Sequence, residues 1–353
     1  MSATQATREA RWQALAQTKG VLARALWPVS VVYGTLMALR RWLYATGRLT
    51  THRLPVPVIV VGNVVVGGAG KTPTVIALVK HLQSRGWRPG VVSRGHGGTH
   101  TRPIQVKADT PLTISGDEPA LIHRNTGAPV FVAKRRVDAA RALLETCPNT
   151  DVLICDDGLQ HLALARDVSI VVFDDRGTGN GWLLPAGLLR EPWPPHGELG
   201  KPDFVLHQHR DDRQPTAVPL PPGTAAFNAT RHLSNEVIGA QGERLTMQAL
   251  QGTSLSAVAG IARPDVFFDM LRARGLTLLN EVALPDHAEL ADYAALLSAG
   301  PATLICTEKD AVKLFQQAIP AGSAVWSAPL EVDIDPAFFN AIEKRASAWK
   351  AED

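Results

Sequence analysis

The segment of residues 58–82 constrains the fold of this 353-residue chain more than any other part. Residues 58–61 are all β-branched, which is typical of a buried parallel strand. A glycine-rich turn, Lys71-Thr72 and apolar residues at helical spacing follow. This order is that of the phosphate-binding loop of nucleotide-binding proteins. The sequence therefore predicts an α/β fold with a doubly wound parallel sheet of the P-loop NTPase type.

The chemistry of such a loop indicates which residues contact a nucleotide. Backbone N–H groups converge on the β-phosphate, Lys71 reaches the β and γ oxygens, and the Thr72 hydroxyl can ligate Mg²⁺. One position departs from the usual GxxxxGK[ST] pattern, because Val65 stands where the first glycine is expected. The predicted nucleotide contacts are Val65, Val66, Gly67, Gly68, Ala69, Gly70, Lys71 and Thr72.

Acidic side chains follow a second predicted strand. Residues 151–155 are mostly apolar and end in Asp156 and Asp157, the position expected for the acid that holds a Mg²⁺ shell. Either carboxylate can meet the metal, so both are candidates together with Thr72. A further strand is predicted at residues 169–174, a short distance after them.

Two more motifs are expected at the same end of the sheet, where ligands bind in doubly wound folds. They are Ser93-Arg94-Gly95 and Gly116-Asp117-Glu118-Pro119. The pair Asp117-Glu118 precedes a predicted helix, so helix capping is an alternative role. A strand at 130–132 and a helix at 137–144 complete the pattern.

The rest of the chain predicts three regions. Residues 54–222 form the nucleotide-binding domain, and residues 175–222 within it are rich in Gly and Pro and are interpreted as loop and linker. Alternating strand and helix patterns over residues 223–353 predict a smaller α/β lobe. Three cysteines without CxxC spacing fit a reducing, cytosol-facing compartment.

Residues 1–53 form a basic arm. They carry eight Lys+Arg and one Glu, so their net charge is +7, whereas the whole chain has only +3. The uncharged run 25–39 is short and interrupted for a membrane span, which needs roughly 20 apolar residues. Its aliphatic, Trp and Tyr residues favour a membrane-interfacial helix over nucleic-acid binding. A helix packed on the protein's own core is the alternative.

Taken together, the motifs resemble the tetraacyldisaccharide 4'-kinase family over about residues 15–345. The residues that carry this resemblance are Val61-Gly62-Asn63, the segment 67–73, Ser93-Arg94-Gly95, the segment 116–119, Asp156-Asp157-Gly158-Leu159-Gln160-His161, the segments 183–185 and 187–191, and Thr307-Glu308-Lys309-Asp310.

The resemblance implies a Mg²⁺-dependent kinase of lipid A biosynthesis. It would transfer the ATP γ-phosphate to the 4'-hydroxyl of a tetraacyl glucosamine disaccharide 1-phosphate and so form lipid IVA. Its implied place is peripheral, on the cytoplasmic face of the bacterial inner membrane, with the N-terminal helix meeting the lipid. The implied partners are this glycolipid and the membrane surface; neither nucleic acid nor an obligate protein partner is expected.

The resemblance also implies roles for individual residues. Asp117 would take the proton of the sugar hydroxyl, with His287 of the Asp286-His287 motif as its partner, and Lys71 would meet the transferred phosphoryl group. Arg190 and Glu191 would lie near the nucleotide. The chain departs from the family pattern at Ala288, where a second polar residue is expected.

Two other readings compete with the kinase. A GTPase would read guanine with an [NT]KxD tetrad, but in Thr307-Glu308-Lys309-Asp310 the lysine comes one position late, and a metallochaperone would need Cys/His clusters that the sequence lacks. A non-enzymatic, membrane-binding ATP module would not need the pair Asp117 and His287. The sequence therefore favours the kinase.

Overall fold

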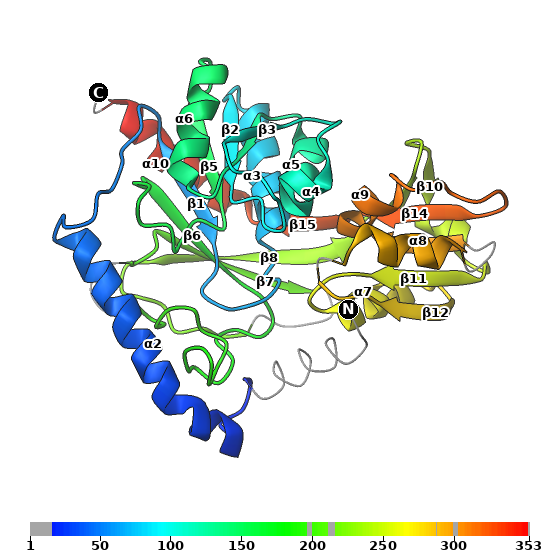
Figure 1. Ribbon diagram of the computed structural model, residues 1–353, viewed down its shortest axis with the longest axis horizontal. Helices are drawn as coiled ribbons and strands as arrows, with labels where there is room; N and C mark the ends of the chain where they lie inside the picture. Colours follow the sequence, from blue (N-terminus) through cyan, green and yellow to red (C-terminus); the bar gives the residue numbers. More distant parts are fainter. Residues whose placement is uncertain (1–15, 196–199, 211–215, 287, 299–302, 352–353) are drawn as a thin grey trace.

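The computed structural model describes residues 16–195, 200–210, 216–286, 288–298 and 303–351. Two sheets form two lobes that lie side by side, and the glycine-rich loop belongs to the larger lobe (Figure 1). The predicted α/β class with a large and a small lobe is confirmed.

The larger lobe is built on a nine-stranded sheet. All its interior pairings are parallel, and only the two edge strands, β15 and β3, pair antiparallel to their neighbours. In sheet order the strands are β15 (Leu330–Ile334), β8 (Ala225–Leu233), β7 (Phe204–Arg210), β6 (Val168–Phe173), β1 (Val58–Gly62), β5 (Val152–Asp156), β2 (Pro89–Ser93), β4 (Val130–Val132) and β3 (Ile104–Val106).

Helices cover both faces of this sheet, which makes it doubly wound. On one face Ile59 and Val61 of β1 pack with residues of α3 (Lys71–Ser84) and α10 (Pro336–Ala351). On the other face Val58 and Val60 belong to a core that includes α6 (Arg136–Thr146). Two shorter helices, α4 (Leu112–Ser115) and α5 (Asp117–Thr126), lie toward the second lobe. Because β1 is buried on both faces, its continuous β-branched run has no polar alternation.

The smaller lobe is a six-stranded mixed sheet with its own core. Its strands, in sheet order, are β10 (Arg244–Thr246), β9 (Glu236–Gly239), β14 (Ala324–Ala328), β13 (Thr303–Thr307), β11 (Leu255–Ala259) and β12 (Leu278–Ala283). Its helices are η1 (Met247–Leu250), α7 (Pro264–Ala273), α8 (Leu290–Ser298) and α9 (Glu308–Leu314).

The path of the chain between the lobes differs from the simple order expected from sequence. The segment 175–222, interpreted as loop and linker, contains β7, which pairs with β6 and β8 inside the large sheet. Strands β8 and β15 and helix α10 all come from residues 223–353 but pack in the larger lobe. The chain therefore leaves the large sheet by one strand and returns to it by another.

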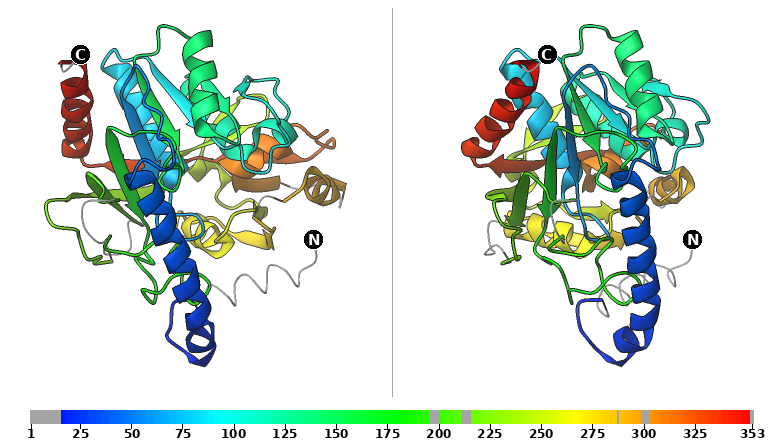
Figure 2. Two further views of the ribbon diagram at one scale, coloured as in Figure 1. Left: turned by 60° about the vertical axis from the view of Figure 1, so that its left-hand side comes forward. Right: turned by 90° about the vertical axis from the view of Figure 1, so that its left-hand side faces the viewer.

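The N-terminal arm contains a long helix, α2 (Val21–Ala45), on the outside of the larger lobe (Figures 1 and 2). The uncharged run considered above is only its middle part, because the helix continues past Arg24 and Arg40. Within the described residues it is the only helix whose length and hydropathy would suffice to cross a bilayer. Core helices and signal sequences satisfy the same criterion, so it is weak evidence of a span.

Candidate active site

The glycine-rich loop explains why a valine can stand at the first glycine position. Val65 is fully buried and forms an antiparallel bridge with Leu189. The Val66 N–H donates to the Leu188 carbonyl at 2.9 Å, so the chain is extended here. Positive φ angles begin only at Gly67 (92°) and recur at Gly70 (75°), where glycine is required. The turn therefore needs no glycine at position 65.

Two side chains that sequence reasoning missed brace this loop from outside. The Arg176 guanidinium is held by Asp174 and donates to the Val66 carbonyl at 2.9 Å. Gln208 on β7 donates to the Gly70 carbonyl at 3.0 Å and to Thr74 at 2.5 Å. A side chain at Gly70 would collide with Gln208. In β7 three apolar residues, 204–206, are followed by four polar ones, 207–210, so no alternation of apolar and polar residues marked Gln208.

Lys71 and Asp157 meet at the centre of the site. The Lys71 ammonium lies 3.5 Å from Asp157 Oδ1 and donates to Asn63 Oδ1 at 3.3 Å. Arg190 approaches the same carboxylate at 3.3 Å. Burial acts to raise the pKa of Asp157, but the two cations outweigh burial and lower it below its ordinary value. Asp157 also has a positive φ of 48°, a strained conformation that often marks functional sites.

Asp156 has a different environment from its neighbour. It is fully buried, its Oδ2 accepts a weak hydrogen bond from Ser93 at 3.4 Å, and its Oδ1 is buried without a partner. Burial, Glu118 and Asp157 raise its pKa to about 7. A carboxylate oxygen with no donor, close to a second carboxylate, suits a divalent cation.

The donor set is small but of the right chemistry for Mg²⁺. The Thr72 hydroxyl and the carboxylates of Asp156 and Asp157 are hard oxygen ligands, and Mg²⁺ takes its other ligands from water and phosphate. Among the residues described, no group of three or more His, Cys, Asp or Glu side chains is placed to hold a metal by itself. The residues present thus fit a cation that arrives with a nucleotide.

Asp117 lies at the start of α5, and glycines let the neighbouring loops reach it. Gly116 has a φ of 81°, and a Cβ there would lie 2.5 Å from the His96 carbonyl. The Ser93-Arg94-Gly95 motif and the Asp117 motif are therefore packed together, as predicted. Asp117 is buried, and its Oδ2 accepts a hydrogen bond from Lys313 of the second lobe at 2.7 Å.

Asp286 and Ala288 of the second lobe, on either side of His287 in the sequence, contact the lysines of α9. Lys309 donates to Asp286 at 2.6 Å, and Lys313 donates to the Ala288 carbonyl at 2.8 Å. His287 itself lies outside the described residues, so its predicted partnership with Asp117 remains a proposal. Ala288, which departs from the family pattern in its side chain, contributes its backbone instead.

The second lobe also decides against a guanine-reading tetrad. Asp310 is completely buried and accepts hydrogen bonds from Tyr293 at 2.5 Å and from the Gly260 N–H at 3.0 Å. It also bonds Thr307, the N-cap of α9. Its carboxylate is engaged within the lobe and cannot pair with a base edge.

Arg190 and Glu191 have different partners in the structure. Arg190 faces Asp157, as described, whereas the buried Glu191 forms an ion pair with Arg41 of α2. The Arg190 carbonyl also accepts a hydrogen bond from Tyr33 at 2.9 Å. Glu191 therefore connects the site to the N-terminal helix rather than pointing at the glycine-rich loop.

Comparison with known proteins identifies the family of the chain. The family described as tetraacyldisaccharide-1-P 4'-kinase matches residues 22–347. Two curated proteins named tetraacyldisaccharide 4'-kinase come from Polaromonas sp. strain JS666 and Acidovorax sp. strain JS42. Each is 52% identical to this chain, over 92% and 94% of the chain respectively and 93% of each relative. The chain belongs to the tetraacyldisaccharide 4'-kinase family.

A solved structure extends the comparison to the fold. LpxK from Aquifex aeolicus, a crystal structure titled as an "apo" form in complex with ATP, superposes with a TM-score of 0.78 at 26% identity. The match covers 92% of this chain and 99% of that one. Because the coverage is nearly complete, both lobes of this kinase family member and its P-loop fold are shared with that protein.

The substitution Asp156→Asn tests the electrostatics of the family's acidic pair. With a folded-state pKa of about 7 and an ordinary value of 3.8, Asp156 binds its proton more tightly in the folded state. Its contribution to stability is complete below about pH 4 and is lost as the pH rises through 7. Without Mg²⁺, the wild type should lose on the order of 3 kcal/mol relative to Asp156→Asn between about pH 4.5 and 7.5.

Urea unfolding of both proteins at the two pH values measures this difference, because titrating groups that do not interact with Asp156 cancel in the comparison. A gap between the two proteins that does not change with pH would mean that Asp156 has an ordinary pKa.

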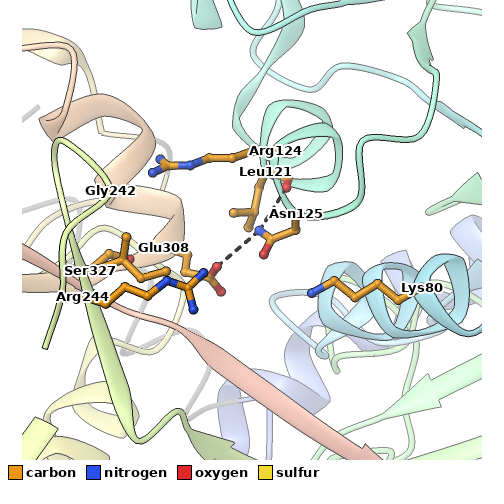
Figure 3. A pocket seen from close by; sticks show the side chains of 9 residues that line it. Lys80, Leu121, Arg124, Asn125, Gly242, Arg244, Glu308 and Ser327 are labelled. Atoms are coloured by element: carbon orange, nitrogen blue, oxygen red, sulfur yellow. Dashed lines mark hydrogen bonds between the residues drawn. The ribbon is translucent and has the colours of Figure 1, made fainter. Parts of the chain in front are cut away.

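A cavity of about 330 Å³ lies between the lobes and contains none of the predicted site residues (Figure 3). Its lining includes Lys80, Arg124, Arg244 and Glu308. One contact crosses it: Asn125 on α5 donates to Glu308 on α9 at 3.2 Å. The cavity thus adjoins one end of the α5–α9 contact, and Asp117 and Lys313 meet at the other end.

Proposed function

We propose that this protein transfers the γ-phosphate of ATP to the 4'-hydroxyl of a tetraacyl glucosamine disaccharide 1-phosphate and so makes lipid IVA. The observation that carries the proposal is family membership across nearly the whole chain, together with a glycine-rich loop whose Lys71 lies 3.5 Å from the Asp157 carboxylate. ATP as the phosphoryl donor is supported by the ATP complex of the Aquifex aeolicus protein.

The proposed chemistry assigns a role to each of three residues, Asp117, Lys71 and Arg190. The sugar hydroxyl oxygen forms a bond to the γ-phosphorus while the bond from that phosphorus to the ADP oxygen breaks. Asp117 accepts the hydroxyl proton, because a carboxylate positioned at the nucleophile can act as a general base. Lys71 and Arg190 offer positive charge to the phosphoryl oxygens, where negative charge is greatest during transfer.

Magnesium is part of this proposal. Thr72, Asp156 and Asp157 are the residues that would hold it, and the unpartnered Oδ1 of Asp156 supports this assignment. When bound, the ion neutralises charge on the β- and γ-phosphates. The backbone of residues 67–70 and the Lys71 ammonium would cradle the phosphates themselves. Val65 and Val66, predicted as nucleotide contacts, are engaged with Leu188 and Leu189 instead.

The test is an incubation of the full-length protein with ATP, Mg²⁺ and the tetraacyldisaccharide 1-phosphate, followed by mass spectrometry of the lipid. The proposal requires a lipid product heavier by one phosphate, at the 4'-position. ATP consumed without change in the lipid would show that the acceptor is another molecule.

We further propose that α2 holds the protein to the membrane surface, on the side where the glycolipid is presented. One side of α2 is bound to the larger lobe: Ser30 accepts from the Ala186 N–H at 3.0 Å and donates to the Leu183 carbonyl at 2.9 Å. Large apolar side chains elsewhere on the helix are exposed, namely Val21, Leu22, Trp27, Val29, Val31, Val32, Leu36, Leu39 and Trp42.

A helix attached along one side to a folded lobe fits an interfacial position better than a span. Its apolar side chains can enter the lipid while arginines meet anionic phosphates. We infer that the protein is peripheral, on the cytoplasmic face of the inner membrane. This location agrees with the interfacial helix and with three cysteines whose spacing fits a reducing compartment.

The double substitution Val32→Asp with Leu36→Asp tests this surface. Both residues are about 60% exposed and one helical turn apart, so the change should leave the fold intact. Sedimentation with anionic phospholipid vesicles should fall at least about tenfold, since charged groups replace apolar area at the interface. Leu279→Asp, at an exposed leucine of β12, is the matched control. Undiminished sedimentation of the double variant would contradict the assignment.

A further inference from the structure

Helix α9 presents two lysines, Lys309 and Lys313, toward the interface between the lobes. They are four residues apart, so they lie on one side of the helix, one turn from each other. Both side chains are largely buried and hydrogen-bonded. Since buried ammonium groups are costly unless paired, their partners identify what they do.

Lys313 connects three parts of the protein. Its ammonium donates to Asp117 Oδ2 at 2.7 Å and to the Ala288 carbonyl at 2.8 Å, and it lies over the Tyr293 ring at 5.8 Å. Asp117 belongs to the larger lobe, whereas Ala288 and Tyr293 belong to the smaller one. The lysine thus crosses the interface at the carboxylate itself.

Lys309, one helical turn before Lys313 on α9, holds the segment that contains Asp286 and Ala288. It donates to Asp286 at 2.6 Å. Burial acts to lower the pKa of Lys309, but Asp286 and Glu118 outweigh burial and raise it, so the ammonium stays charged. The two lysines therefore hold this segment at two points: Lys309 binds the Asp286 side chain, and Lys313 binds the Ala288 carbonyl.

The α5–α9 contact keeps these lysines in place. Leu121 of α5 and Val312 of α9 are buried in one small apolar cluster, and Asn125 bonds Glu308 on its outer side (Figure 3). Val312 is adjacent to Lys313, so the apolar contact and the ion pair form a single interface. A shift of α9 against α5 would move the cation relative to Asp117.

We propose that Lys313 is a positioning residue for phosphoryl transfer: it orients the Asp117 carboxylate and ties it to the Ala288 carbonyl, while Lys309 anchors Asp286. The proposal rests on the function proposed above, in which Asp117 accepts the hydroxyl proton. With Oδ2 held by Lys313, the plane of the carboxylate is set, and so is the direction in which it meets an acceptor hydroxyl. Proton acceptance thereby depends on the contact between the two lobes at Asp117 and Lys313.

The test compares Lys313→Met, Lys313→Gln and Lys313→Arg with the wild type in the lipid kinase assay. We expect Lys313→Met to lower kcat about 100-fold with KM for ATP changed less than about threefold, because misplacement of one reacting group costs that much. Lys313→Arg, which keeps the charge, should recover at least about tenfold. Lys344→Met, the same change at an exposed lysine of α10, should have no effect.

A double-mutant cycle separates positioning from a merely structural role. If Lys313 acts through Asp117, the variant carrying both Asp117→Asn and Lys313→Met should turn over no more slowly than Asp117→Asn alone. Amide hydrogen exchange near residues 284–290 should rise in Lys313→Met and in Lys309→Met but not in Lys344→Met. Lys313→Gln supplies the same comparison if Lys313→Met does not fold.

Two results would overturn the proposal. One is a Lys313→Met or Lys313→Gln protein with kcat within about threefold of the wild type. The other is a double variant whose loss equals the product of the two single losses, which would mean that the residues act independently. Failure of the proposed function is a separate outcome, since it would be seen as absence of phosphorylated lipid with the wild-type protein.

Discussion

Replacing Asp117 with asparagine is expected to lower kcat for lipid phosphorylation about 10²–10⁴-fold, the usual contribution of a general base. The amide has nearly the same shape as the carboxylate but cannot accept the hydroxyl proton. KM for ATP should change only a few-fold, because the proposed phosphate-binding contacts come from the glycine-rich loop and Lys71. The measurement is steady-state kinetics with the glycolipid acceptor.

The asparagine also leaves the Lys313 ammonium without its carboxylate partner, so some loss of stability is expected. Thermal unfolding of the same preparation separates this loss from the catalytic one. Asp109→Asn, the same change at an exposed position, is the control. Turnover of Asp117→Asn at the wild-type rate would exclude Asp117 as the base.

Replacing Lys71 with methionine should produce the second large effect, a fall in kcat/KM for ATP of about 10²–10³-fold. The ammonium lies next to Asp157, and in the proposed function it meets the β- and γ-phosphates. Its loss removes positive charge from the phosphates and also removes the cation that lowers the pKa of Asp157. The affinity for ATP and the rate of transfer should therefore both fall.

Lys80→Met is the matched control, because Lys80 is an exposed lysine of the same helix, α3. Nucleotide binding can be followed by equilibrium dialysis with ATP and Mg²⁺, and transfer by the lipid assay. If Lys71→Met bound and used ATP as well as Lys80→Met does, the glycine-rich loop would not be the phosphate site.

Local sequence was a good guide where local physics controls the structure. Buried parallel strands such as β1 need apolar residues on both faces, and the left-handed turns of the loop need glycine, so both leave a pattern along the chain. The carboxylates Asp156 and Asp157 were located for the same reason, at the end of a β-strand. The candidate site within the larger lobe was therefore largely predictable.

Supporting residues from distant segments were not predictable in this way. Gln208 reaches the loop only because β7 lies within the large sheet, two strands from β1, in a segment read as linker. Arg176 braces the loop carbonyls from a turn more than a hundred residues away. No spacing rule connects such pairs, since their contacts depend on how the sheet is assembled.

The sequence alone determined the P-loop chemistry, the α/β class, the family and the basic, apolar N-terminal arm. Each of these is recognised from short segments whose residues are neighbours in the chain. The tertiary structure decided which groups share a charge environment. It separated Asp156 from Asp157 by burial, joined Glu191 to Arg41, and set Lys313 beside Asp117 across 196 positions. Interactions of this kind depend on the distance and solvent exposure that folding creates, and neither is a property of local sequence.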